Sequence, residues 1–301
     1  MAHDHLQIHK INSTSGRLII TVILNFVITI AQIIGGIISG SLSLISDALH
    51  NLSDALSMAI SYVALRLKRK DSSYNHTFGL KRAEILAAFI NSSVLVGISI
   101  YLFYEAVVRF FNPSVIDGKL MLIVAVIGLA ANVIGMILLR KDSGESMNIR
   151  SSYLHLLTDT ISSVAVILGG LAIYYFDVYW IDPLLTVIIG VYILKESYSI
   201  VIDSVHVLME GAPKEINIDE VVESISELDA VEDVHHIHVW SVGENDTYFE
   251  AHINVKDMLI NEAKPVQAEI EKILKQKFKI NHVTLQFECI SCLNNNIIAE
   301  D

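Results

Sequence analysis

Two short stretches decide how this chain can fold: His50-Asn51-Leu52-Ser53-Asp54 and its repeat, His155-Leu156-Leu157-Thr158-Asp159. Each places a histidine and an aspartate four residues apart within a long apolar run. On an α-helix this spacing puts both side chains on one face, one turn apart. Because ionisable groups at membrane depth are costly, they normally face the interior of a helix bundle and mark an ion or substrate path.

The repeat predicts an intramembrane metal site made from two helices. Two imidazoles and two carboxylates supply the four nitrogen and oxygen ligands that a small divalent ion such as Zn2+ prefers. A single His–Asp pair would be explained equally by an interhelical hydrogen bond. Its recurrence in a second apolar segment favours the metal path over structural bonding.

Composition indicates a membrane protein with a soluble appendage. The 301 residues are 52% hydrophobic with a mean hydropathy of +0.51, and 18% are charged. From position 213 to the end, 18 acidic and 7 basic residues give a net charge of −11, out of −12 for the whole chain. The lack of a basic stripe argues against a nucleic-acid partner, and a strongly acidic domain concentrates cations near itself.

The two cysteines, Cys289 and Cys292, stand close together near the end of the chain. This count excludes a disulfide framework, and C-x-x-C in a reducing compartment indicates metal or redox chemistry. Positions 1–17 are polar and rich in histidine, without the basic start and short apolar stretch of a secretory signal. We therefore expect no cleaved signal peptide.

Six stretches are apolar and long enough to cross a membrane as helices, which takes about 20 residues each: 18–38, 42–65, 82–109, 120–139, 153–176 and 182–207. Basic residues crowd the connections after the second and fourth, so those connections and both termini are expected in the cytoplasm, with the bundle in the cell membrane. The predicted domains are a His-containing cytoplasmic N-terminal segment at 1–16, a six-helix transmembrane domain at 17–209 and a cytoplasmic domain at 210–301.

The C-terminal part is predicted to form a small α+β domain. Helical periodicity covers 217–228 and 265–278, and alternating apolar residues indicate strands at 234–242, 247–255 and 282–287. Asn217 or Asp219 is available to cap the first helix. The order αββαβ predicts one small sheet covered by two helices, as in ferredoxin-like and metallochaperone-like domains.

These features together resemble the cation diffusion facilitator family, in its zinc-transporting branch of the bacterial cobalt-zinc-cadmium efflux type. The resemblance covers nearly the whole chain. It is carried by Ser-Leu-Ser-Leu-Ile-Ser-Asp-Ala-Leu-His-Asn-Leu-Ser-Asp at 41–54, Phe-Gly-Leu-Lys-Arg-Ala-Glu-Ile-Leu at 78–86, the second His-x-x-x-Asp at 155–159 and Val-His-His-Ile-His-Val-Trp at 234–240. One His-x-x-x-Asp alone is a weak signal, whereas two among six spans are specific.

The resemblance implies a homodimer that exports divalent metal from the cytoplasm in exchange for protons. Its transport site would be His50, Asp54, His155 and Asp159. Local chemistry agrees, because metal binds the deprotonated ligands and so competes with protons. Two carboxylates against one divalent ion also leave the site neutral, which eases its burial.

The resemblance also implies that the C-terminal domain binds metal and dimerises. His235, His252 and Glu288 would form one ligand group, and Cys289 with Cys292 would begin another. The cysteine pair could be completed by His3 and His5, although a His-rich chain end is as often unliganded.

Three other histidines and one aspartate are assigned no ligand role. His236 and His238 alternate with His235 along a strand, so the three cannot all face one ligand set. His206 is interpreted as structural or accessory. Asp47 shares a helix face with His50 and is expected to orient that imidazole by accepting a hydrogen bond.

The leading hypothesis is a Zn2+/H+ antiporter that works by alternating access between inward- and outward-facing states. An intramembrane zinc metalloenzyme is the first alternative, but no separate nucleophile or base motif accompanies the ligands. A membrane metal sensor is the second. Within the transporter class, Cd2+ or Co2+ as main substrate stays open, because affinity order alone does not set selectivity.

Overall fold

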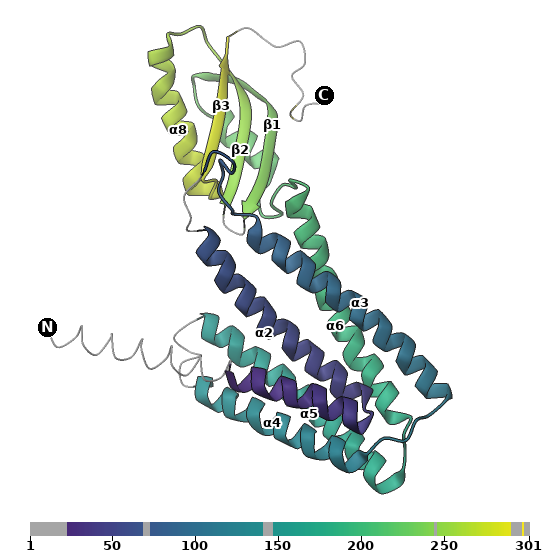
Figure 1. Cartoon of the computed structure of the whole chain (residues 1–301). Coiled ribbons are helices and arrows are strands. Elements are labelled where there is room, and N and C mark those ends of the chain that lie inside the picture. The colour runs from purple at the N-terminus through teal and green to yellow at the C-terminus, as the bar shows by residue number, and fades with distance from the viewer. Residues whose placement is uncertain (1–22, 69–72, 141–146, 244–245, 290–296, 298–301) are drawn as a thin grey trace, which may run out of the picture. The chain divides into compact units, whose positions relative to one another are not determined.

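The computed structural model describes residues 23–68, 73–140, 147–243, 246–289 and 297 (Figure 1). The chain forms two compact units. One contains Met1–Tyr62 and Ile90–Val201, and the other contains Val63–Phe89 and Ile202–Asp301. The second unit therefore includes the connection between the helices Leu42–Lys68 and Ala83–Phe111 as well as the C-terminal domain. The domain boundaries near 17 and 210 stay predictions.

Long helices fill the first unit and extend into the second. They are a shorter apolar helix at Ile23–Ser39, α2 (Leu42–Lys68), α3 (Ala83–Phe111), α4 (Gly118–Arg140), α5 (Met147–Phe176) and α6 (Ile181–Leu208). Within the described residues, α3, α4, the part of α5 from Leu156 and α6 are long and apolar enough to cross a membrane. The helical, multi-pass membrane fold is confirmed, and the count of six spans stays a prediction.

Each predicted span coincides with a helix to within a few residues, except that α5 starts at Met147 rather than near 153. The turn between the first helix and α2 uses Gly40, whose φ of +77° lies in the region that glycine adopts without strain. Gly40 therefore lets the chain reverse its direction there without a longer loop.

Asp182, at the start of α6, caps the N-terminus of α2. Its fully buried carboxylate accepts hydrogen bonds from the backbone N–H groups of Leu42 (2.8 Å) and Ser43 (3.2 Å). The hydroxyls of Ser41 and Ser43 donate to the same carboxylate at 2.6 Å each. A negative charge at this position satisfies the free N–H groups of the helix and opposes the positive end of its dipole.

The C-terminal domain follows the predicted αββαβ order. Its elements are α7 (Ile218–Ser226), β1 (Val231–Gly243), β2 (Asp246–Val255), α8 (Ile260–Phe278) and β3 (His282–Glu288). The strand order is β1-β2-β3, with β1 antiparallel and β3 parallel to β2. The helix α8 provides the crossover that a parallel pair requires. The predicted α+β fold is confirmed.

Apolar side chains from both helices and the sheet form the core of this domain. Val221 and Ile225 of α7, Phe249 of β2, and Ile270 and Leu274 of α8 are all buried in one cluster. The predicted cap is confirmed, because the Asn217 side chain accepts from the backbone N–H of Asp219 at 3.0 Å.

The predicted start of the second helix near Pro265 was wrong. Glu262 bonds back to the backbone N–H of Leu259 at 2.8 Å, and this cap begins α8 at Ile260. Pro265 therefore falls inside the helix.

Replacing Asp182 with alanine should destabilise the membrane unit. The substitution leaves the serine hydroxyls and the first N–H groups of α2 buried without their acceptor, at a cost of about 2 kcal/mol or more. Thermal unfolding of the purified protein in detergent measures this loss of stability. Asp177→Asn, at an exposed carboxylate bonded to Tyr179, is the matched control and should change stability by less than about 0.5 kcal/mol. Equal melting of both variants would contradict the capping role.

Candidate metal sites

The structure brings together one residue from each His-x-x-x-Asp repeat. Nε2 of His50, on α2, lies 3.9 Å from Oδ1 of Asp159, on α5. His50 is 8% exposed and Asp159 is 1% exposed. An imidazole and a carboxylate far apart in the sequence therefore face each other inside the helical unit.

Asp54 and His155 lie in the same two helices, and their side chains are outside the described part of the structure. A helix places residues four apart on one face, so Asp54 follows His50 and His155 precedes Asp159 by one turn. The four-ligand set thus stays a prediction, in which each helix contributes one imidazole and one carboxylate.

Side chains of two neighbouring helices contact α2 at and near His50. The ring of Tyr192, on α6, packs edge-on against the His50 imidazole with centroids 5.8 Å apart. Asn91 of α3 donates to the hydroxyl of Ser53 at 2.9 Å, one residue before Asp54. Both α6 and α3 therefore contact α2 close to its candidate ligands.

The predicted role of Asp47 in orienting His50 stays a prediction, and the structure shows two other partners of Asp47. Its buried carboxylate accepts from Nε2 of Gln32 at 3.0 Å and from the hydroxyl of Ser162. Asp47 lies three residues before His50 on α2, and these two hydrogen bonds connect it to other helices. The sequence held a signal for this network, because Gln32 is a polar residue within an apolar span.

A second group of candidate ligands lies in the C-terminal domain, where each strand supplies one residue. His235 of β1, His252 of β2 and Glu288 of β3 have ligand atoms that all lie within 4.8 Å of one another. Nδ1 of His252 is 2.9 Å from one Glu288 oxygen, and Nε2 of His235 is 3.6 Å from the other. We refer to these residues as the cytoplasmic trio.

Strand register explains why these three residues meet. His235 pairs directly with His252 across β1 and β2. On the other side, His252 pairs with Gln286 of β3, and Glu288 is two residues further along. Residues two apart on a strand share a face, so Glu288 projects toward the histidines.

The His235 ring is oriented as a metal ligand would be. Nδ1 bonds to the Asp233 carboxylate at 2.9 Å, which directs the opposite nitrogen, Nε2, toward the trio. Nε2 is buried and has no hydrogen-bond partner among the described residues. A buried nitrogen without a partner costs free energy, which a bound cation would recover. The residues present therefore fit a divalent metal ion.

The neighbouring histidines His236 and His238 are not part of this ligand set. His236 lies at an irregularity in the β1–β2 pairing and has a φ of +52°, in the left-handed region. Its ring stacks on that of His252, with centroids 4.5 Å apart and planes 6° apart, and contacts His238 at 5.1 Å. Within the described residues, only His235 of the three reaches the trio.

The other predicted ligands are less constrained by the structure. Cys289 is exposed and free. Cys292, His3 and His5 lie outside the described residues, so the proposed cysteine-based group stays a prediction. His206 does have a structural role, because its Nε2 lies 2.8 Å from the carbonyl oxygen of Ala212 and fixes the turn after α6.

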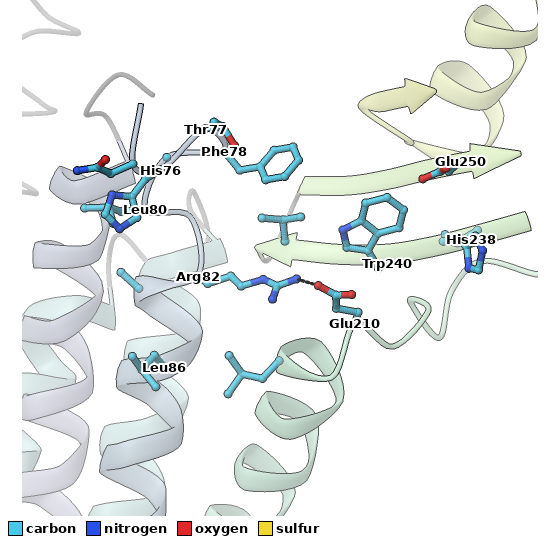
Figure 2. Close-up of a pocket in the computed structure, with 16 residues that line it drawn as sticks. His76, Thr77, Phe78, Leu80, Arg82, Leu86, Glu210, His238, Trp240 and Glu250 are labelled. Atoms are coloured by element: carbon cyan, nitrogen blue, oxygen red, sulfur yellow. Dashed lines mark hydrogen bonds and ion pairs between the residues drawn. The ribbon is translucent and has the colours of Figure 1, made fainter. Parts of the chain in front are cut away.

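A pocket of about 820 Å³ lies within the second compact unit (Figure 2). Its walls come from the loop before α3, the first turn of α3, the end of α6 and strands β1 and β2. Arg82 and Glu210 form an ion pair of 2.9 Å in it, and Trp240 forms part of its wall. The sequence analysis did not identify this pocket, because its sides are far apart in the chain.

Lys81 links the loop before α3 to strand β2. Its ammonium group donates to the Asp246 carboxylate at 3.0 Å and to the Tyr248 hydroxyl at 3.2 Å. Partial burial lowers the pKa of Lys81, but the hydrogen bonds to Asp246 and Tyr248 outweigh it, so the net pKa is raised. The Phe78 ring adds an edge-on contact to Tyr248, with centroids 5.3 Å apart.

Known protein families match nearly all of the chain. The transmembrane-domain model of cation efflux proteins matches residues 18–209, and the cytoplasmic-domain model of the same proteins matches residues 213–289. The first match contains the His50–Asp159 pair. The second contains the cytoplasmic trio.

Several bacterial transporters are similar over almost their whole length. The "Cadmium, cobalt and zinc/H(+)-K(+) antiporter" of Bacillus velezensis is 37% identical, covering 99% of this chain and 95% of that protein. The "Metal cation efflux system protein CzcD" of Cupriavidus metallidurans is 36% identical over 87% of this chain and 83% of the relative. The "Zinc transporter ZitB" of Pectobacterium atrosepticum is 34% identical, with coverages of 97% and 90%.

One solved structure, the metal-bound C-terminal domain of the CzcD transporter, is 30% identical over 24% of this chain and 99% of that one. Its TM-score of 0.22 is too low to indicate a shared overall fold.

Replacing Asp233 with alanine should weaken metal binding at the cytoplasmic trio by roughly 10- to 100-fold, the usual effect of removing the partner of a ligating histidine. Zn2+ competition with a chelating dye on the full-length protein measures this affinity, and His252→Ala identifies which binding phase belongs to the trio. Asp257→Ala, at an exposed carboxylate of the same domain, should leave the affinity unchanged. An unaltered trio affinity in Asp233→Ala would refute the orienting role.

Lys81→Met should lower stability at neutral pH, because it removes two hydrogen bonds to the sheet. The folded-state pKa of Lys81 is raised above its ordinary value of 10.5, so its contribution is fully present below that pH. The contribution is lost as pH rises through the raised value. Denaturant midpoints from pH 8 to 11 should therefore converge for the two proteins only above about pH 10.5.

Lys214→Met is the control for this series, since Lys214 pairs with Asp203 in an exposed ion pair that contributes little. If the denaturant midpoint of Lys81→Met at pH 8 equals that of the wild type, the bonds of Lys81 to the sheet do not stabilise the protein.

Proposed function

This chain belongs to the cation efflux family, and from that premise we propose that it exports Zn2+ from the cytoplasm in exchange for protons. It is a multi-pass membrane transporter of divalent cations rather than an enzyme. The observation that carries the proposed mechanism is the buried approach of His50 on α2 to Asp159 on α5. That pair supports a transport site formed by His50, Asp54, His155 and Asp159.

The chemistry of these four ligands suits coupled exchange. Metal binds the deprotonated carboxylates and neutral imidazoles, so protons arriving from the far side of the membrane compete with it and promote its release. With both carboxylates ionised, a divalent ion makes the site neutral, and without metal the carboxylates take up protons for the same reason. The metal-bound site and the protonated site can therefore both be buried, whereas the site with two ionised carboxylates and no metal cannot.

Alternating access follows from this requirement. The site opens to one side when its ligands are charged and closes when metal or protons neutralise them. A metal ion favours whichever state gathers all its ligands. His50 on α2 and Asp159 on α5 would separate when the site opens, because they belong to different helices.

Zn2+ is the proposed main substrate because two histidines and two carboxylates form its preferred tetrahedral shell. The names of similar transporters include zinc, cadmium and cobalt. Cobalt and cadmium accept similar ligands, so the protein is expected to carry them too. It should carry them less efficiently than Zn2+, because the geometry of a site sets its selectivity.

The C-terminal domain is proposed to hold a resident metal ion at the cytoplasmic trio and to form a homodimer. The matching cytoplasmic-domain family and the fit of His235 to a metal support this placement. Both termini are proposed to lie in the cytoplasm. There, the acidic domain, with a net charge of −11 beyond position 213, would concentrate divalent cations near itself on the cytoplasmic side of the membrane.

Proton-driven Zn2+ uptake into inverted membrane vesicles tests this function directly. Wild-type protein should accumulate Zn2+ when the vesicle interior is acidified, and both Asp54→Ala and Asp159→Ala should reduce the initial rate by at least about 100-fold, because a divalent ion would lack a charged ligand.

The control is Asp203→Ala, which removes a carboxylate from the exposed end of α6. It should transport at the wild-type rate. Zn2+ uptake by Asp159→Ala equal to wild type would exclude the proposed site, and a complete lack of flux in wild-type vesicles would favour a membrane metal sensor instead.

A further inference from the structure

A buried hydrogen-bond network crosses the helical unit close to the proposed transport site. Its centre is the Asp47 carboxylate on α2, which is 2% exposed. One oxygen accepts from the Ser162 hydroxyl on α5, and the other accepts from the Gln32 amide on the helix Ile23–Ser39, at 3.0 Å. Three helices are thus joined through one carboxylate.

The network joins the two ligand-bearing helices one turn away from their ligands. Asp47 precedes His50 by three residues on α2, and Ser162 follows Asp159 by three residues on α5. Residues three apart on a helix lie on adjacent turns of the same face. A bond between Asp47 and Ser162 therefore fixes the spacing of α2 and α5 one turn from the level where the ligands meet.

Gln32 is itself held in place on two sides. Its amide oxygen accepts from Asn51 of α2 at 3.4 Å. On α4, Gly128 leaves the space that the amide fills, because a Cβ atom there would lie 2.7 Å from Nε2 of Gln32. The glycine thus allows the amide to reach Asp47, and Gln32 is fully buried as a result.

We propose that Gln32, Asp47 and Ser162 are positioning residues that set the metal selectivity of the transport site, favouring Zn2+ over the larger Cd2+. The inference rests on the proposed transport function and concerns how its site discriminates between ions. None of the three residues is a metal ligand. They act by holding α2 and α5 at the separation that a small ion requires.

The physical reason is that each helix carries half of the ligand shell. Zn2+ binds nitrogen and oxygen at about 2.0–2.2 Å, so all four ligands must come close at once. A small outward shift of α2 from α5 lengthens every cross-helix distance and penalises Zn2+ first, whereas a larger ion still contacts all four ligands. Selectivity among similar divalent ions depends on this kind of geometric control rather than on ligand affinity.

The experiment compares Ser162→Ala with Ser162→Thr. Alanine removes the hydroxyl that bonds Asp47, and threonine retains it. Initial rates of proton-driven Zn2+ and Cd2+ uptake into inverted vesicles give kcat/KM for each ion. We expect the Zn2+-to-Cd2+ ratio to fall roughly tenfold in Ser162→Ala, and to stay at the wild-type value in Ser162→Thr. A ratio is the chosen readout because loss of folded protein lowers both rates equally.

Two further variants disturb the network at other positions. Gly128→Ala adds a Cβ atom on α4 that should displace the Gln32 amide. Asp47→Asn replaces an accepting oxygen with an amide N–H group, which cannot accept the hydrogen bond from Gln32. Both should lower the same ratio. Thr29→Val is the matched control, since it deletes a buried hydroxyl whose bond among the described residues stays within its own helix, to the carbonyl of Asn25.

The inference is overturned if Ser162→Ala and Gly128→Ala both transport with the wild-type ratio, or if Thr29→Val lowers it as much as they do. Failure of the transport function is a different result, since wild-type vesicles would then accumulate neither ion. If Asp47→Asn fails to fold, the Ser162 and Gly128 variants still decide the question.

Discussion

A carboxylate buried among apolar helices must be neutralised, and this constraint governs the membrane unit of the protein. Asp159 is almost completely buried on α5, in a segment whose composition suits a lipid environment. An isolated charge there would cost an amount comparable to the whole stability of a folded domain. The carboxylate therefore needs a proton, a hydrogen-bond partner or a cation. A transporter that exchanges metal for protons alternates between two of these solutions.

Both candidate metal sites place ligands on regular secondary structure and orient them through a second polar group. In the sheet, Asp233 fixes the ring of His235, and strand register brings His252 alongside it. In the helical unit, Asp47 connects the ligand-bearing helices through Ser162. The Asp182 cap fixes the start of α2, eight residues before His50. Rigid support of this kind keeps the ligands close to one geometry.

Local patterns in the sequence predicted much of the fold. Apolar length identified the membrane helices, and the alternation of apolar residues identified the sheet, because both depend on residues close together in the chain. The start of α8 was misplaced, since a proline near a helix start is a weaker signal than the Glu262 cap that precedes it. The pair His50 and Asp159 followed from repeated spacing, whereas the bonds of Asp47 to Gln32 and Ser162 did not. Those bonds depend on how helices distant in sequence pack, and spacing contains no information about packing.

The central claim is that two imidazoles and two carboxylates on α2 and α5 share one divalent ion. The most direct measurement is zinc K-edge X-ray absorption on the full-length protein carrying His235→Ala and His252→Ala, loaded with one equivalent of Zn2+ per chain. The account predicts a four-coordinate shell of nitrogen and oxygen at about 2.0–2.1 Å, with imidazole scattering from two rings. A shell containing sulfur at about 2.3 Å, or zinc with the spectrum of the hydrated ion, would contradict it.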